Sequence, residues 1–211
     1  MIAIQFIGVI VTGYLLGAIP CGVVLGKLTR GIDVRDYGSG SMGMTNVMRT
    51  VGVKAGLIVL LSDILKGAAA VALAWPIFHS APEMLEWGHM AGGAAAVVGH
   101  SWPVYIGFRG GRSVSTAFGA LMVISWQVGL IVLAVVLLEV AIFRYISLGS
   151  ILGGVTAVIA MIAFAVYGQE PYAYMAYTLV VVPILIFRHR GNIKRLLAGT
   201  EPKIGQRVKI S

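Results

Sequence analysis

The sequence predicts an all-α protein that crosses a membrane about seven times. Apolar residues make up 58% of the 211 residues and charged residues only 11%, against about 45–50% and about 25% in soluble domains. Sixteen bases and eight acids are too few to cover a water-soluble globule of this length. Several apolar stretches approach the roughly 20 residues that a helix needs to cross a bilayer. A single transmembrane domain over residues 1–211 is therefore expected, and the lone Cys21 excludes an internal disulfide.

The apolar stretches give the expected spans in chain order. Five are separate stretches, namely Ile2–Leu25, Ala55–Phe78, Trp87–Tyr105, Leu148–Tyr167 and Tyr172–Phe187. Between the third and the fourth lies Val114–Phe143, in which Glu139 is the only charge and which is too long for one ordinary span. We interpret it as a hairpin of two short helices that turns near Ser125–Val128. The start of the chain has no basic residue, so a cleaved signal peptide is not expected.

The positions of the bases predict which side each loop faces. Fifteen of the sixteen bases lie in the four segments that this layout places on one side, and only Lys66 lies inside a span. The segments on the other side carry Glu83, Glu86 and Glu170 and no base. Because cytoplasmic loops collect Lys and Arg, the amino terminus is expected outside and the carboxyl terminus in the cytoplasm. The same sidedness explains much of the net charge of +8 without a nucleic-acid partner.

The first basic segment, Gly31–Arg49, is rich in glycine and in hydrogen-bond donors. Gly38, Gly40 and Gly43 match G-x-G-x-x-G, but the flanking membrane helices exclude the strand that a dinucleotide fold needs. Glycines still let backbone N–H groups turn toward an anion. Further donors and a charge come from Ser39, Ser41, Thr45, Asn46 and Arg49. The segment is expected to bind an anionic substrate, and a flexible connector is the alternative.

The second basic segment, Gly99–Thr116, contains the run Arg109-Gly110-Gly111-Arg112. Two arginines around a Gly-Gly turn suit a phosphate, because the guanidinium fork matches phosphate oxygens and glycines permit a close approach. The alternative is that both arginines only hold the loop on the cytoplasmic side by charge. His100 lies at the end of a span, where packing is as reasonable a role as catalysis.

The last two basic segments are Phe143–Ser150 and Arg188–Ile204. The first is a short polar turn that includes Ser150, and the second is a basic tail suited to anionic lipid head groups. In the tail His189 and Asn192 are three residues apart, so they share a face if the helix continues. Histidine is a natural acid or base near neutral pH, although a solvent-exposed surface role is the alternative.

Three ionisable residues fall inside the expected spans: Asp63, Lys66 and Glu139. Charges are costly in lipid, so each is a candidate functional residue. Asp63 and Lys66 are three residues apart on one helix, and an internal ion pair facing the bundle is the alternative interpretation.

Taken together, these segments resemble the bacterial acyl-phosphate glycerol-3-phosphate acyltransferases, small polytopic membrane enzymes of phospholipid synthesis. The resemblance runs along the whole chain and rests on GSGSMGMTNVMR, DILKG, GHSWPVYIGFRGGRSVST, RYISLGS and RHRGNIKRLLAGTEPKI. It implies a seven-helix fold in the bacterial inner membrane with its conserved loops at the cytoplasmic face. It also implies transfer of a fatty acyl group from acyl phosphate to the 1-position of glycerol 3-phosphate, which gives lysophosphatidate. The implied partners are these two substrates and membrane lipids, with no metal or other cofactor.

The resemblance assigns residues as well. Ser39 and Arg49 match functional positions of the family's first loop, Arg112 follows the Gly-Gly turn where Lys is usual, and Ser150 matches a serine near the site. His189 and Asn192 match the pair of the final motif. We therefore expect His189, Asn192 and Ser39 to be catalytic. Substrate binding is expected from Arg49, Arg112, Ser150, Gly40, Gly110, Gly111 and Asn46. Departures from the usual motifs are Ser41, Met42, Met44, Arg112 and Ser113.

This chemistry needs no covalent intermediate on the enzyme. The phosphate of an acyl phosphate is a good leaving group, so binding both substrates in register can supply much of the catalysis. The proton of the attacking hydroxyl would go to His189 or to a substrate phosphate. A small transporter or channel for an anionic solute is the alternative function, and it predicts polar residues at mid-membrane, broken helices and an internal repeat.

Overall fold

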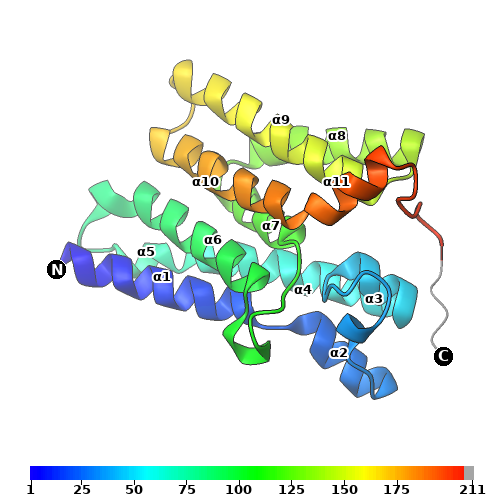
Figure 1. Cartoon of the computed structure of the whole chain (residues 1–211). Helices are drawn as coiled ribbons and strands as arrows, with labels where there is room; N and C mark the ends of the chain where they lie inside the picture. The colour runs from blue at the N-terminus through cyan, green and yellow to red at the C-terminus, as the bar shows by residue number, and fades with distance from the viewer. Residues whose placement is uncertain (207–211) are drawn as a thin grey trace.

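The protein is helical throughout residues 1–206, the part of the chain that the computed structural model describes (Figure 1). Eleven α-helices are connected by short turns and three 3-10 helices, with no strand in this range. The elements are α1 Ile2–Ala18, α2 Cys21–Arg30, η1 Val34–Asp36, α3 Met44–Thr50, α4 Val53–Ala72, α5 Ala74–Ile77, η2 Pro82–Met84, α6 Leu85–Ser101, η3 Val104–Ile106, α7 Val114–Ile124, α8 Trp126–Phe143, α9 Ile146–Val166, α10 Tyr172–Arg188 and α11 Arg190–Leu197.

The long helices form two groups joined by α7 and by direct packing of α6 on α10. Helices α1, α4 and α6 pack on one another, and α9 packs against both α8 and α10. Helix α7 contacts α4, α6 and α8 and so connects the groups, as Figure 1 shows. The largest buried apolar cluster lies at this junction and includes Val97, Leu121, Val132, Met161 and Val181.

The outer faces of these helices are apolar. Ile4, Leu61, Leu138 and Ile159 have 73%, 58%, 63% and 63% of their surface exposed, on α1, α4, α8 and α9. An exposed apolar surface spread over this many helices suits contact with lipid rather than water. The prediction of an all-helical, membrane-embedded protein is confirmed.

Helices α1 and α6 approach closely because glycine and alanine line their interface. A Cβ atom on Gly17 would lie 2.1 Å from the carbonyl oxygen of Ala96, and one on Gly13 would lie 2.6 Å from that of Gly92. In lipid, helices associate through van der Waals packing, so small residues that allow such approach are favoured at interfaces.

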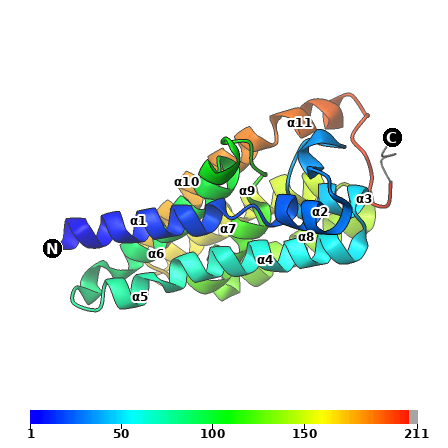
Figure 2. The ribbon, with the colours of Figure 1, turned by 90° about the horizontal axis from the view of Figure 1, so that it is seen from below.

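The polar segments gather at one end of the bundle. In Figures 1 and 2 the short helices α2, α3 and α11 lie together at the end opposite the amino terminus. The final described residues return to this end, where the N–H of Ile204 donates to the carbonyl of Arg144 at 2.9 Å. The four basic segments of the sequence are therefore neighbours in space.

The expected spans agree with the helices to within a few residues, but their number does not follow from length alone. Four segments among the described residues are long and apolar enough to cross a bilayer: Ile2–Arg30, Val53–Ile77, Trp126–Phe143 and Ile146–Val166. Helix α10 with α11 is a fifth candidate, bent by 58°. Helices α6 and α7 have 17 and 11 residues and are shorter. Seven crossings and the orientation of the termini remain predictions.

The hairpin expected within residues 114–143 is present. Helix α7 ends at Ile124 and α8 begins at Trp126, so the turn is at Ser125. The Ser125 hydroxyl accepts a hydrogen bond from the N–H of Val128 at 3.5 Å, which caps α8.

The first predicted span, Ile2–Leu25, falls within one of the candidate spans, but it is interrupted. The helix stops at Ala18 and a new one begins at Cys21. Pro20 lies at this break, and a proline has no N–H to donate and crowds the carbonyl four residues earlier, which disfavours a continuous helix here. The carbonyl of Ile19 instead accepts a hydrogen bond from the ammonium group of Lys66 at 2.9 Å.

Two further expectations are corrected at the polar end. Met44–Thr50 was expected within a loop but forms helix α3. The shared face of His189 and Asn192 depended on a helix that continues through both, and this condition is not met, because α10 ends at Arg188 and α11 runs at 58° to it. His189 stands in the break, so the two residues are not placed by one regular helix.

Candidate active site

The four polar segments enclose a group of adjoining cavities at this end of the bundle. One is lined by Ser39, Gly40, Gly110, Arg112 and Asn192. A second adds Arg49 to Ser39, Arg112 and Asn192. A third, deeper cavity brings together Ser39, Asn46, Arg112, Ser150 and His189. The fold thus collects nine of the ten predicted site residues around these cavities, and Gly111 lies beside them in the backbone.

Asn46 holds the first loop together through hydrogen bonds from its side chain to the loop backbone. It is buried, and its amide nitrogen donates to the carbonyls of Val34, Tyr37 and Ser41 at 2.7, 3.2 and 2.8 Å. Its amide oxygen accepts from the N–H of Ser39 at 2.9 Å. Because these contacts use the hydrogen-bonding groups of Asn46, its geometry favours support of the loop over the predicted contact with substrate.

The first loop leaves the side chain of Ser39 exposed between Gly38 and Gly40. Both glycines have a positive φ, of 61° and 67°, which favours glycine over other residues. The tight turn places the Ser39 hydroxyl on the wall of the cavity that Arg112 and Asn192 share.

The two arginines that flank the Gly-Gly turn differ in their surroundings. Arg109 is exposed, whereas Arg112 is partly buried and lines all three cavities. Burial lowers the pKa of Arg112 from 12.5 to about 10, so this guanidinium stays charged at neutral pH. Within residues 1–206 it has no hydrogen-bond partner, which leaves its donors free for an anion.

Cations dominate the walls of the two outer cavities. Among the described residues that line them there are six, Arg49, Arg112, Arg188, Arg190, Lys194 and Arg195, and no carboxylate. Burial also lowers the pKa of Arg49, whose guanidinium donates to the carbonyl of Pro202 at 3.3 Å. Such a site attracts an anion with several negative oxygens.

His189 is neutral at physiological pH and has a defined tautomer. Burial lowers its pKa to about 4, and the nearby charge of Arg112 acts in the same direction. Its Nδ1 lies 2.8 Å from the carbonyl oxygen of Leu185, which can only accept. Nδ1 must therefore carry the proton, and Nε2 has the lone pair that can accept a hydrogen bond from a substrate hydroxyl.

Glu201 was not singled out in the sequence, yet it joins the tail to α9 and α11 at the site. Its carboxylate accepts hydrogen bonds from Ser147 at 2.6 Å, Asn192 at 2.6 Å and Arg195 at 2.7 Å. Burial alone would raise the pKa of Glu201, but these donors outweigh it and hold the pKa below its usual range. The contact with the amide nitrogen of Asn192 fixes that side chain, so that its amide oxygen is the group left for a substrate.

A buried charge cluster forms part of the wall of the deepest cavity, through Asp63 and His100. Asp63 and Lys66 form the expected ion pair, with an O–N distance of 2.8 Å and almost no exposure. Nδ1 of His100 lies 3.5 Å from the same carboxylate and 3.3 Å from the hydroxyl of Thr116. The ring of His100 packs directly against Gly111, where any Cβ atom would collide with it. These contacts favour a structural role for His100.

An apolar cavity continues from the polar site into the bundle. It is lined by residues of α4, α7, α8, α9 and α10, including Ile64, Phe118, Leu133, Ala157 and Val181. It shares five lining residues with the deepest polar cavity, namely Leu60, Val114, Ser115, Val136 and Ser150. A ligand with a charged head and an apolar tail fits this pair of cavities.

No three His, Cys, Asp or Glu side chains lie close enough to hold a metal ion within the described part of the chain. The chemistry available here comes from cations, backbone amides, hydroxyls and one neutral imidazole.

Comparison with known proteins identifies this architecture. The family model described as glycerol-3-phosphate acyltransferase matches residues 7–199. The chain belongs to this family. The enzyme class implied by the resemblance is confirmed, and the transporter alternative is excluded.

Curated members of the acyltransferase family are similar over almost the whole chain. A glycerol-3-phosphate acyltransferase of Trichormus variabilis is 42% identical over 212 residues, which cover 95% of this chain and 92% of the relative. One of Parasynechococcus marenigrum is 44% identical over 196 residues, which cover 93% and 88%.

Two solved structures have the same fold. The chain is 36% identical to PlsY, an integral membrane glycerol 3-phosphate acyltransferase, in its glycerol 3-phosphate form, with a TM-score of 0.84 over 95% of this chain and 96% of that one. The lysophosphatidic acid form of PlsY gives a TM-score of 0.82 at 35% identity, over 95% of each chain.

Three residues that contribute to the site were not picked out from the sequence: Arg35, Arg188 and Glu201. Arg35 and Arg188 contact backbone carbonyls of the second loop, as described below. Each of them lies in one of the basic segments of the sequence. Which backbone or carboxylate partner a long side chain reaches depends on tertiary structure, and no local pattern in the sequence specifies it.

Proposed function

We propose that this acyltransferase moves a fatty acyl group from acyl phosphate to the sn-1 hydroxyl of glycerol 3-phosphate. The products are lysophosphatidate and inorganic phosphate. The observation that carries the proposal is the continuity of a cation-lined cavity with an apolar one through Ser150 and its neighbours. Each substrate has a phosphate for the first cavity, and the donor has an acyl chain for the second.

The reaction is a direct displacement at the acyl carbon. The glycerol oxygen forms the new ester bond, the C–O bond of the mixed anhydride breaks, and phosphate leaves with the electron pair. Arg49, Arg112 and the amide of Gly110 would bind phosphate oxygens and stabilise the developing charge. The amides of Gly40 and Gly111 donate to the carbonyls of Tyr37 and His100 at 3.2 and 3.0 Å, so these two glycines would shape the loops that bind the substrate. Asn46 would support the first loop.

Ser39, His189 and Asn192 would orient the reacting groups. Nε2 of neutral His189 can accept a hydrogen bond from the glycerol hydroxyl. Because burial keeps the pKa of His189 at about 4, it is a weak base. This supports transfer of the hydroxyl proton to a phosphate oxygen, with His189 as the group that aligns the nucleophile.

We further propose that residues 1–211 form one transmembrane domain with seven crossings in the bacterial cytoplasmic membrane. The amino terminus would be outside, and the active-site loops and the carboxyl terminus in the cytoplasm. The gathering of the basic segments at one end of the bundle supports this orientation.

The assay that tests the reaction compares three acyl donors. Membranes that contain the protein, and control membranes that lack it, are given labelled glycerol 3-phosphate with acyl phosphate, acyl-CoA or acyl carrier protein. We expect labelled lysophosphatidate with acyl phosphate. Absence of product above control with every donor would contradict the proposed reaction, and product from acyl-CoA alone would contradict the donor.

A further inference from the structure

Two arginines from different parts of the chain hold the backbone of the second loop, residues 103–112, here called the Gly-Gly loop. Nη1 of Arg35 donates to the carbonyls of Ile106 and Arg109 at 2.8 and 3.2 Å. Arg188 donates to the carbonyls of Gly110 and Gly111 at 3.0 and 2.9 Å. Three consecutive carbonyls, those of residues 109–111, are therefore fixed by guanidinium groups.

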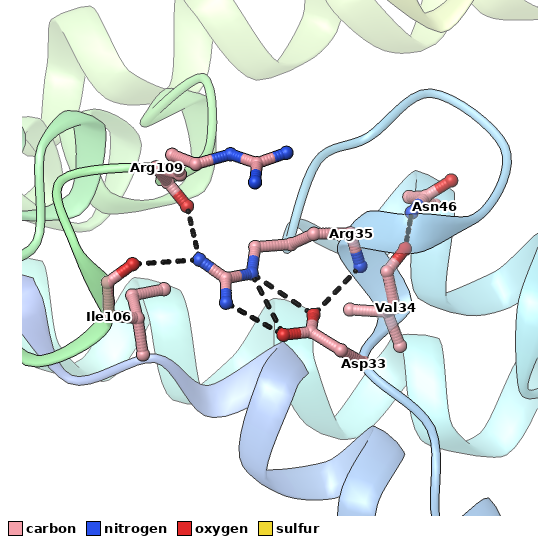
Figure 3. A network of polar contacts seen from close by, with 6 residues as sticks. All are labelled: Asp33, Val34, Arg35, Asn46, Ile106 and Arg109. Atoms are coloured by element: carbon pink, nitrogen blue, oxygen red, sulfur yellow. Dashed lines mark hydrogen bonds and ion pairs between the residues drawn. The ribbon is translucent and has the colours of Figure 1, made fainter.

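Arg35 is itself fixed on the side away from the loop. Figure 3 shows its guanidinium between the carboxylate of Asp33 and the two loop carbonyls. Nε and Nη2 each contact Asp33, at 3.0 and 2.7 Å, and Nη1 is left to reach across to the Gly-Gly loop. This arrangement joins the first loop to the second and balances the charge of Arg35 locally.

Arg188 is fixed in a different way. It is the last residue of α10, and its guanidinium lies 5.5 Å from the centre of the Trp102 ring. Nε and Nη2 form a fork that spans two successive peptide groups, which a lysine ammonium cannot reproduce. The side chain is partly buried between the ring and the loop.

Fixing these carbonyls also fixes the amides. In a trans peptide the carbonyl and the next N–H point in opposite directions. The carbonyls of Arg109, Gly110 and Gly111 therefore set the N–H groups of Gly110, Gly111 and Arg112. The N–H of Gly111 donates to the carbonyl of His100 at 3.0 Å. Those of Gly110 and Arg112 have no acceptor within residues 1–206, and both residues line the outer cation-lined cavity.

We propose that Arg35 and Arg188 are positioning residues, which hold the N–H groups of Gly110 and Arg112 ready for a phosphate group. Arg35 lines none of the three cavities, and Arg188 lines one of them while its Nε and Nη2 donate to the loop. They keep the loop in its binding conformation, so that binding does not have to pay for ordering it. This inference rests on the proposed function, because the phosphate belongs to glycerol 3-phosphate or to acyl phosphate.

The test replaces each arginine by lysine, which keeps the charge and removes the fork. For Arg35→Lys and Arg188→Lys we expect the KM of one phosphorylated substrate to rise about tenfold or more, since one charge-assisted hydrogen bond is worth that much. We expect kcat to change less than about threefold. Varying glycerol 3-phosphate and acyl phosphate in separate arms shows which phosphate the loop binds.

The control is Arg30→Lys, at an exposed position at the end of α2, which should leave both KM values unchanged. A second readout is the rise in Tm that glycerol 3-phosphate or inorganic phosphate causes in the purified protein, which should shrink in both site variants. Should Arg35→Lys not fold, Asp33→Asn decides for Arg35, because it loosens that side chain without removing it and should raise the same KM. Should Arg188→Lys not fold, Trp102→Leu decides for Arg188 in the same way, because it removes the ring that lies beside the guanidinium.

Unchanged KM values and ligand-induced Tm shifts in the folded variants would overturn the inference, as would a fall in kcat alone. Absence of activity in the wild-type protein with every donor would instead overturn the proposed function. The two failures are thus distinguishable.

Discussion

Arg112 is the partly buried cation that all three cavities share, and its donors have no partner among the described residues. Replacing it by alanine removes a charge aimed at a phosphate without removing a structural contact. We predict that Arg112→Ala lowers kcat/KM by about 10²-fold or more, in line with the loss of one preorganised charged donor. The protein should still insert and unfold at the wild-type temperature.

The matched variant is Arg112→Lys, which restores the residue that the family usually carries. It should keep activity within about tenfold of wild type, because the charge is retained and only the fork is lost. Steady-state kinetics with both substrates check the pair. Wild-type kinetics in Arg112→Ala would remove this residue from the site.

His189 makes stability depend on pH in a defined direction. Its pKa is about 4 in the folded protein, against about 6.5 in an unfolded chain. Below pH 6.5 the unfolded state binds more protons, so stability is complete above that pH and falls as the pH drops toward 4. At pH 5 the loss from this one group is about 2 kcal/mol.

The measurement is thermal unfolding of the purified protein between pH 7 and pH 5. We expect Tm to fall less in His189→Gln, which cannot take up the proton, than in wild type. The control is His79→Gln at an exposed position, which should follow the wild-type curve. Equal slopes for wild type and His189→Gln would show that His189 is not held neutral by burial.

At the scale of the helices, glycines in α1 give a matched pair of positions. Gly17 faces the backbone of α6, where a Cβ atom would lie 2.1 Å from the Ala96 oxygen, and Gly8 has nothing within 4 Å. We predict that Gly17→Ala destabilises the protein by about 1–3 kcal/mol because the helices must separate. Gly8→Ala should be neutral or slightly stabilising. Unfolding of both variants in the same detergent checks this, and equal stabilities would contradict the close packing.

Most helices were predictable from the sequence because their signal is local. A run of about 20 apolar residues leaves few alternatives to a helix in lipid, and the turn at Ser125 followed from the length of the run between Val114 and Phe143. The interruption between α1 and α2 also had a local signal, because Pro20 lacks an N–H. The apolar residues on both sides of Pro20 made the stretch look like one continuous span. Helix α3 was missed because its glycine-rich neighbours and donor side chains are typical of a loop.

The sequence predicted which residues form the site, but not the role that each residue has in it. Ser39, Arg112 and His189 stand in motifs, and the fold brings them together. Asn46 turns its amide groups toward its own loop, and Glu201 fixes Asn192 within the same tail segment. These contacts depend on the path of irregular backbone between the partners, which the spacing of residues along the segment does not encode.

At the scale of the whole molecule, the orientation in the membrane is the prediction to test. In a Cys21→Ser background, Glu83→Cys lies in the turn at the far end of the bundle and Lys203→Cys in the tail beside the site. A membrane-impermeant maleimide applied to intact cells should label the first and reach the second only after permeabilisation. The reverse pattern would overturn the proposed sidedness.

The joined cavities have a consequence for how the rate depends on concentration. A charged pocket that opens into an apolar one through Ser150 and Val136 draws its two reactants from different phases. In the proposed reaction the effective concentration of the acceptor, glycerol 3-phosphate, is its molar concentration in the cytosol. The effective concentration of the donor, acyl phosphate, is its mole fraction in the bilayer. Adding inert lipid at fixed total donor should therefore slow the enzyme by surface dilution, although the bulk concentrations are unchanged.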